Sequence, residues 1–193
     1  MCGIAGYVGD RESADVLVDA LSKLEYRGYD SAGIAVFDHG NIKVKKCKGR
    51  LANLVEKMDE EGKPQGHVGI GHTRWATHGE PSDINSHPHG NKRVTIVHNG
   101  IIENYKKLKD FLIGEGYSFA SETDTEVAAK LLDYYYDGDP MKTIAKVLSE
   151  IKGSYALGIM FRDFPDEIFA VRKDSPLIVG VGEHENFIAS DVP

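Results

Sequence analysis

Long hydrophobic runs, dense basic segments and a cysteine framework are all missing from this chain of 193 residues. No apolar run reaches the roughly 18 residues that a membrane-spanning helix needs, and we expect no signal peptide before Cys2. The formal net charge is −7, and basic residues gather only in the short segment 43–48, so nucleic acid and membrane are not expected partners. We expect a cytoplasmic protein in which Cys2 and Cys47 are two free thiols.

The hydrophobic residues, 41% of the chain, alternate between strand-like and helix-like patterns without internal repeats. The first expected helix begins near Ser13, which is its expected N-cap. The other expected helices are residues 51–58, 105–113, 124–136 and 141–151. The expected strands are residues 2–8, 32–37, 42–47, 68–72, 94–98, 155–161, 167–171, 177–181 and 187–189. This mixture predicts one α+β domain with two sheets. We expect this domain to be truncated at its C-terminal end, after Pro193. Lys43, Lys45, Lys46 and Lys48 are expected to line the solvated edge of a strand.

Cys2 follows the start methionine, which is a special position for a thiol. If Met1 is removed, Cys2 carries an α-amino group whose pKa, about 7.7–8.0, suits a general base. One residue would then supply the nucleophile and the base that activates it. The alternative is a small buried residue that opens a strand, which is the commoner state of a free cysteine.

Four polar stretches interrupt the apolar pattern: YRGYDSAG (26–33), HTRWATHG (72–79), HNGIIEN (98–104) and SETDTE (121–126). Each has a purely structural interpretation. Asn99-Gly100 is typical of a tight hairpin turn, and residues 123–126 have the pattern of a capping box in which Thr123 is the N-cap. Arg74 could be a surface ion-pair residue, and Trp75 a core residue.

The same groups together also suit nucleophilic attack on an amide. The oxyanion that forms needs preorganised donors, which the Asn99 side-chain amide and the Gly100 N–H can supply. A free amino acid also needs its two charged groups held. Arg74 offers a planar fork for the α-carboxylate, and Asp124 offers a negative charge for the α-ammonium.

Histidines are frequent between residues 72 and 98, which raises the question of a metal. His72, His78, His87, His89 and His98 do not show HExxH spacing, and no CxxC is present. We therefore expect neither a metal site nor a cofactor.

Read in order, the N-terminal CGI, the four polar stretches and SHPH (86–89) resemble the glutaminase domains of the class II glutamine amidotransferases. HTRWATHG, SHPH and HNGIIEN are most similar to the glutamine–fructose-6-phosphate aminotransferase (glucosamine-6-phosphate synthase) family, and the resemblance covers the whole chain. It implies an N-terminal-nucleophile hydrolase fold, a four-layer αββα sandwich of two antiparallel sheets. It also implies that two sugar-isomerase domains, which bind fructose 6-phosphate, are absent from these residues, and that the full-length protein is a homodimer.

The resemblance assigns roles by motif. Cys2 matches the nucleophile, Asn99 and Gly100 match the oxyanion hole, and Arg27 matches the arginine beside the nucleophile. The residues that match the glutamine-binding pocket are Arg74, Trp75, Thr77, His78, Gly100 and Asp124. Trp75 also matches the gate for ammonia, and His87 lies in a loop that the family places near the second site.

These observations predict an enzyme that hydrolyses L-glutamine to glutamate and ammonia through a γ-glutamyl thioester on Cys2. In the full-length enzyme the ammonia would convert fructose 6-phosphate to glucosamine 6-phosphate, a step of hexosamine biosynthesis. Two alternatives stay open at this point. The chain could belong to a class II amidotransferase with a different acceptor, or it could be a catalytically silent module that binds glutamine.

Overall fold

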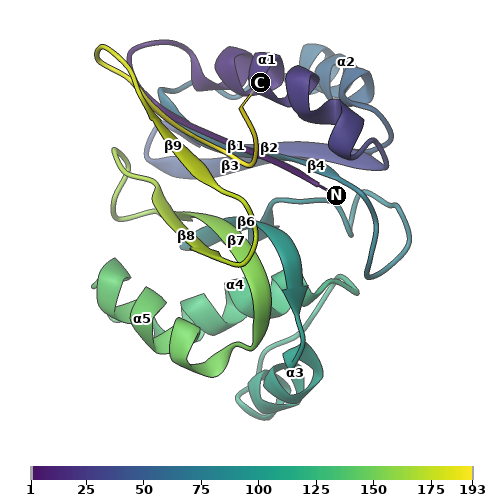
Figure 1. Cartoon of the computed structure of the whole chain (residues 1–193), viewed down its shortest axis with the longest axis vertical. Coiled ribbons are helices and arrows are strands. Elements are labelled where there is room, and N and C mark those ends of the chain that lie inside the picture. The colour runs from purple at the N-terminus through teal and green to yellow at the C-terminus, as the bar shows by residue number, and fades with distance from the viewer. Residues whose placement is uncertain (1, 193) are drawn as a thin grey trace.

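Two antiparallel sheets lie face to face at the centre of the computed structural model, which describes residues 2–192 (Figure 1). The first sheet has the strand order β3-β2-β4-β1-β10-β9 and the second has the order β5-β6-β7-β8. The strands of the first sheet are β1 (Gly3–Val8), β2 (Ser31–Asp38), β3 (Asn41–Lys48), β4 (Val68–Arg74), β9 (Ile178–Val181) and β10 (Asn186–Ala189). Those of the second are β5 (His89–Gly90), β6 (Val94–Ile102), β7 (Gly153–Phe161) and β8 (Phe169–Lys173).

Helices cover the outer face of each sheet, so that the order of layers is helix, sheet, sheet, helix (Figure 1). On the first sheet lie α1 (Ser13–Leu24) and α2 (Leu51–Glu61), and a 3₁₀ turn (Glu25–Arg27) follows α1. On the second sheet lie α3 (Tyr105–Gly114), α4 (Asp124–Tyr135) and α5 (Pro140–Glu150). The predicted four-layer αββα architecture is confirmed.

Three hydrophobic clusters fill the three interfaces between these layers. Leu17 and Leu54 belong to the cluster under α1 and α2, and Leu132 belongs to the cluster under α3, α4 and α5. Neighbouring residues of a strand enter different clusters: Ile96 contacts the helices, whereas Val97 faces the other sheet. Because both faces of these strands are buried, the central strands appear in the sequence as continuous apolar runs.

Two local predictions are wrong. Ser13 is the first residue of α1 and not its N-cap, a position that Glu12 occupies. Asn99-Gly100 does not form a hairpin turn, because β6 continues through both residues and pairs them with Ala156 and Tyr155 of β7. Gly100 has φ +112°, and a Cβ there would collide with the backbone carbonyl of Ser154. The glycine therefore serves a close approach of two strands.

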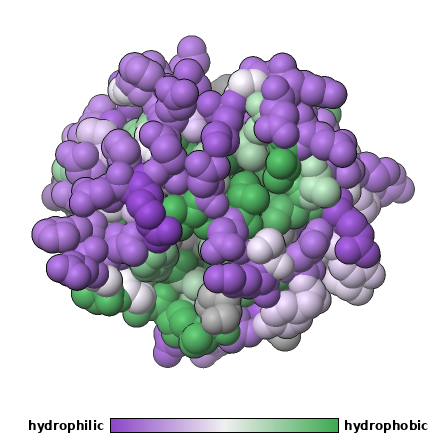
Figure 2. Space-filling model, turned by 90° about the horizontal axis from the view of Figure 1, so that it is seen from above, coloured by the Kyte–Doolittle hydropathy of each residue, from purple (hydrophilic) through white to green (hydrophobic). Residues whose placement is uncertain are grey.

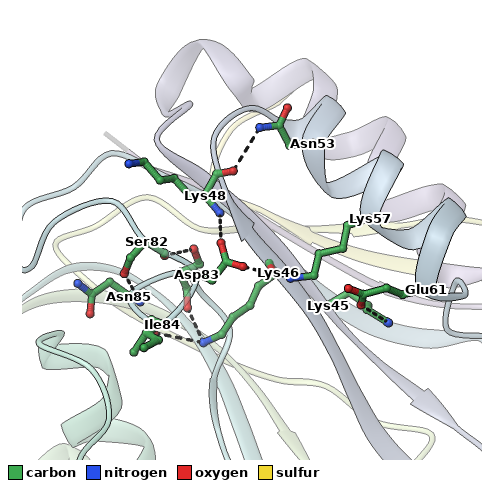
Figure 3. Close-up of polar contacts among 11 residues, drawn as sticks. Lys45, Lys46, Lys48, Asn53, Lys57, Glu61, Ser82, Asp83, Ile84 and Asn85 are labelled. Carbon is green, nitrogen blue, oxygen red and sulfur yellow. Dashed lines mark hydrogen bonds and ion pairs between the residues drawn. The ribbon is translucent and has the colours of Figure 1, made fainter.

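The prediction of a solvated lysine edge is wrong for Lys46. β3 is the edge strand, as expected, but the Lys46 ammonium donates to the backbone carbonyls of Ser86 (2.8 Å) and Pro88 (3.1 Å). Figure 3 shows the Lys46 side chain extending from β3 towards Ile84, whose carbonyl oxygen lies 3.5 Å from Lys46 Nζ. Burial lowers the pKa of Lys46 to about 8. Asp83 accepts from the backbone N–H of Lys48 at 2.7 Å and from Lys57 Nζ at 3.1 Å. These contacts bind the loop 82–88 to β3 and α2.

Most of the face above α1 and α2 is hydrophilic, with hydrophobic side chains visible between the charged ones (Figure 2). Within residues 2–192, no helix combines the length and the apolar character needed to cross a membrane. Cys2 and Cys47 are both free thiols, as predicted.

Candidate active site

A cavity of about 310 Å³ is lined by side chains from both sheets and from the loops that follow β4 and precede α4. All ten residues proposed from the sequence line this cavity: Cys2, Arg27, Arg74, Trp75, Thr77, His78, His87, Asn99, Gly100 and Asp124. They are spread over more than 120 positions of the chain, and the fold brings them together.

Cys2 lies directly before β1, and its sulfur contacts the backbone at the end of β4. Cys2 Sγ accepts a hydrogen bond from the Trp75 N–H at 3.1 Å and lies 3.4 Å from the Trp75 carbonyl oxygen, to which the thiol can donate. Burial raises the pKa of the Cys2 thiol, against the opposing effect of the Trp75 N–H and the Arg74 charge. The thiol is therefore protonated in the resting state, and it needs a base before it can attack.

Asn99 reaches from β6 of the second sheet to the nucleophile on the first. Its Nδ2 donates to the Cys2 carbonyl oxygen at 2.9 Å, and its Oδ1 lies 3.0 Å from His72 Nε2. An amide NH₂ group has two hydrogens, so one remains for a ligand in the cavity. Asn99 and Gly100 are consecutive, and both line the cavity beside Cys2.

Arg74, the last residue of β4, is 3% exposed, yet no carboxylate lies within ion-pair distance of it among residues 2–192. Its Nη2 donates to the carbonyl oxygens of His78 and Gly79, the latter at 3.1 Å, while its buried Nη1 has no partner in this part of the chain. Burial lowers the pKa of Arg74. A buried guanidinium without a counter-ion is costly, and it favours binding of an anion.

Asp124 supplies a carboxylate of the opposite sign in the same cavity. It begins α4, is 4% exposed, and accepts from the Ile102 backbone N–H at 2.8 Å through Oδ2. Its Oδ1 makes no hydrogen bond to any described residue. Thr123 is the N-cap of α4, as predicted, and accepts from the Glu126 N–H at 3.2 Å. The Glu126 carboxylate, however, accepts from Ala120 and Ser121, so the capping box is only half formed.

Comparison with known proteins identifies the family to which this chain belongs. The family model described as "Glutamine amidotransferase domain" matches residues 72–193. The chain belongs to the glutamine amidotransferase family. Curated relatives named glutamine–fructose-6-phosphate aminotransferase [isomerizing] are 60% identical in Clostridium tetani and 53% identical in Thermus thermophilus. Each match covers 100% of this chain and 32% of the relative, so the chain spans about a third of their length.

A solved structure of glutamine phosphoribosylpyrophosphate amidotransferase from B. subtilis superimposes with a TM-score of 0.84 at 29% identity. The superposition covers 98% of this chain and 42% of the other. The amidotransferase domain thus has the N-terminal-nucleophile hydrolase fold that the sequence predicted.

Two structural alternatives for residues of the amidotransferase domain are wrong. Arg74 is buried and not a surface ion-pair residue, whereas Trp75 is 46% exposed and not a core residue. The Trp75 ring meets Tyr29 edge to face at 5.6 Å on the rim of the cavity. Arg27 is held by Asp191, whose Oδ2 lies 2.9 Å from Arg27 Nη2.

The pocket residues after β4 lie close together. Thr77 Oγ1 is 3.3 Å from His78 Nδ1, and the His78 ring meets Tyr105 edge to face at 5.2 Å. His87, which the resemblance associates with a second site, is 5% exposed; its ring stacks on His72 with centroids 4.0 Å apart.

Sequence reasoning missed several residues of the cavity, and His72, which lies behind it. The cavity residues not predicted are His98, Ile101, Thr123, Thr125, Ser154, Ser175 and Pro176. In the sequence, His72 and His98 raise only the question of a metal site, and no group of three or more metal-ligating side chains meets within residues 2–192. The signal that could have identified them is their position in the HTRWATHG and HNGIIEN stretches, beside Arg74 and Asn99.

Proposed function

We propose that this domain hydrolyses L-glutamine to L-glutamate and ammonia through a γ-glutamyl thioester on Cys2. The observation that carries the proposal is the buried Arg74 without a carboxylate partner in the described chain, in the same cavity as Cys2 and Asn99. An amino-acid α-carboxylate supplies the missing counter-ion, and Arg74 Nη1, which has no partner in the described chain, can donate to it.

Each charged or reacting group of glutamine has a counterpart in the cavity. Asp124 Oδ1 accepts from the α-ammonium, and Arg74 holds the α-carboxylate. The side-chain amide carbonyl then points towards Cys2, where the free hydrogen of Asn99 Nδ2 and the Gly100 N–H stabilise the developing oxyanion. Thr77 and His78 complete the wall around the substrate.

The reaction needs Cys2 at the N-terminus, and Met1 lies outside the described residues. After removal of Met1 the free α-amine takes the thiol proton, and the thiolate attacks the side-chain amide carbon. The tetrahedral intermediate collapses, the C–N bond breaks, and the amine proton leaves with ammonia. Water then attacks the thioester, assisted by the same amine, and releases glutamate and the Cys2 thiol.

The first experiment is mass spectrometry of the processed protein after incubation with a glutamine analogue that carries an electrophilic ketone at the amide position. The expected result is one adduct, on Cys2, together with release of glutamate from glutamine. Cys2→Ala should give neither. Glutamine binding without glutamate release by the processed wild-type protein would instead identify a silent binding module.

The relatives' names support a proposal for the acceptor of the ammonia. We propose that residues 1–193 are the glutaminase part of a longer cytoplasmic, homodimeric enzyme, and that sugar-isomerase domains outside these residues use the ammonia to convert fructose 6-phosphate to glucosamine 6-phosphate. Arg27 and the exposed Trp75 rim the cavity from which ammonia must leave, which supports a gating role. Kinetics of a longer chain that contains the remaining two thirds would test the acceptor directly.

A further inference from the structure

We infer that His72 is a positioning residue, which fixes the orientation of the Asn99 side-chain amide and thereby the oxyanion hole; the inference rests on the proposed function. His72 lies in β4, a central strand, and pairs with Ile4 of β1 and Gly33 of β2. It is 1% exposed, and its side chain points across to the second sheet. There His72 Nε2 lies 3.0 Å from the His98 carbonyl oxygen and 3.0 Å from Asn99 Oδ1.

These two contacts determine the tautomer of His72. A backbone carbonyl can only accept, so the ring nitrogen 3.0 Å from the His98 oxygen must carry the hydrogen. The same N–H is shared with the second oxygen, Asn99 Oδ1. His72 is therefore the Nε2–H tautomer, and it offers Asn99 a donor.

The donor in turn determines which way Asn99 points. With Oδ1 on His72, Asn99 Nδ2 lies 2.9 Å from the Cys2 carbonyl oxygen and donates to it. In the flipped amide, two oxygens would meet at Cys2 and two N–H groups would meet at His72. Both changes leave buried polar groups unpaired, which makes the flipped amide unfavourable. The second hydrogen of Nδ2 is consequently kept beside the nucleophile.

A stacked histidine pair keeps His72 neutral. The His87 ring lies parallel to that of His72, with an interplanar angle of 19° and 4.0 Å between centroids. His87 Nε2 and His98 Nδ1 both contact the hydroxyl of Thr125, at 2.7 and 2.9 Å, so that hydroxyl can donate to one ring and accept from the other. His72 Nδ1 is buried without a partner in the described chain, so a proton there would leave a charged N–H unpaired.

The test compares His72→Phe, which keeps an aromatic ring against His87 but removes the N–H, with His72→Gln, which retains an N–H donor. Because the oxyanion forms only after attack, His72→Phe should lower kcat about 100-fold and change KM by less than about twofold. The kcat of His72→Gln should be at least about tenfold higher than that of His72→Phe, because the glutamine retains an N–H donor. Alkylation of Cys2 by iodoacetamide needs no oxyanion hole, and its rate should be unchanged in both variants.

A double-mutant cycle shows whether His72 acts through Asn99. In an Asn99→Ala background, His72→Phe should change kcat by less than about twofold, because the group that it positions is already gone. The matched control is His89→Phe, which removes another buried histidine that does not contact Asn99. Its effect on kcat should be the same in both backgrounds. An unchanged kcat in His72→Phe, or an equal loss in the Asn99→Ala background, would overturn the inference.

A measurement that does not depend on turnover separates this inference from the proposed function. If the processed wild-type protein releases no glutamate, the glutaminase proposal fails. The side-chain Nδ2 protons of Asn99, assigned by their absence in Asn99→Ala, still report the orientation. In the wild type they should give separate, slowly exchanging NMR signals, and in His72→Phe their exchange with water should be at least about tenfold faster. Equal exchange rates would refute the positioning of Asn99 by His72, whatever the activity.

Discussion

Acidification should destabilise this domain in a pH range where its carboxylates are still ionised. The reason is the set of four buried histidines, His72, His87, His89 and His98, each at most 5% exposed. Burial is the largest effect on all four, and it lowers the pKa of His72 to about 3 and the pKa values of the other three below their ordinary value. The folded protein therefore holds them neutral near pH 6, whereas the unfolded chain protonates them.

The sign and size of the effect follow from proton linkage. A histidine in the unfolded chain has a pKa of about 6.5, so below that pH the unfolded state binds protons that the folded state does not. The stabilising contribution is complete above pH 6.5 and is lost as the pH falls towards the folded pKa. Between pH 7 and 5.5 a histidine whose folded pKa lies well below 5.5 lowers the free energy of unfolding by about 1.2 kcal/mol. His72, His87 and His89 together lower it by about 4 kcal/mol, and His98, whose pKa is also lowered, adds to this loss. A typical domain has about 5–15 kcal/mol in total.

Urea denaturation followed by far-UV circular dichroism at pH 7.0 and 5.5 measures this loss directly. Aspartate and glutamate in an unfolded chain titrate near pH 4, so they contribute little in this interval. His89→Gln removes one titrating group and should reduce the loss between the two pH values by about 1.2 kcal/mol. A total loss below about 1.5 kcal/mol in the wild type, the contribution of one histidine, would refute the reasoning.

Three further outcomes are expected. Arg74→Lys and Asp124→Asn should each weaken glutamine binding by about 1–3 kcal/mol and so raise the KM for glutamine; an unchanged KM in both variants would contradict the proposed contacts. Asn99→Ala should lower kcat about a hundredfold or more with little change in KM, as judged from initial-rate kinetics of glutamate release. Preparations that retain Met1 should be inactive, so the glutaminase rate plotted against the processed fraction from intact-mass analysis should extrapolate to zero; full activity with Met1 present would mean that another base activates Cys2.

The layers of this fold were predictable because its strands and helices differ in hydrophobic period. The buried strands have nearly continuous apolar runs, and α2 shows Leu51, Leu54 and Met58 at helical spacing. Local turn chemistry was less reliable. Asn99-Gly100 has the strongest hairpin signal in the chain, but the pairing with β7 and the crowding at Gly100 favour a continuous strand. Tertiary contacts decided against local propensity there.

The candidate site was predictable as a set of motifs but not as a network of contacts. The motif residues all line one cavity, although they come from the position directly before β1, the 3₁₀ turn after α1, the end of β4 and the loop after it, the interior of β6 and the start of α4. The partnership of His72 with Asn99 was not predictable, since it joins residues 27 positions apart across two sheets. The same is true of Lys46, whose charge indicated solvent but whose ammonium binds carbonyl groups 40 and 42 positions away.

The two halves of the reactive centre belong to different sheets. Cys2 precedes a strand of the first, whereas Asn99 and Gly100 lie within a strand of the second. Apart from the hydrogen bonds of His72 and Asn99, the sheets pack through apolar side chains, and these contacts allow small shifts at little cost because they have no preferred direction. Catalytic rate should therefore report the alignment of the sheets more sensitively than thermal stability does. Core substitutions between the sheets, such as Val97→Ala or Met160→Leu, should therefore change the catalytic rate more than they change the melting temperature.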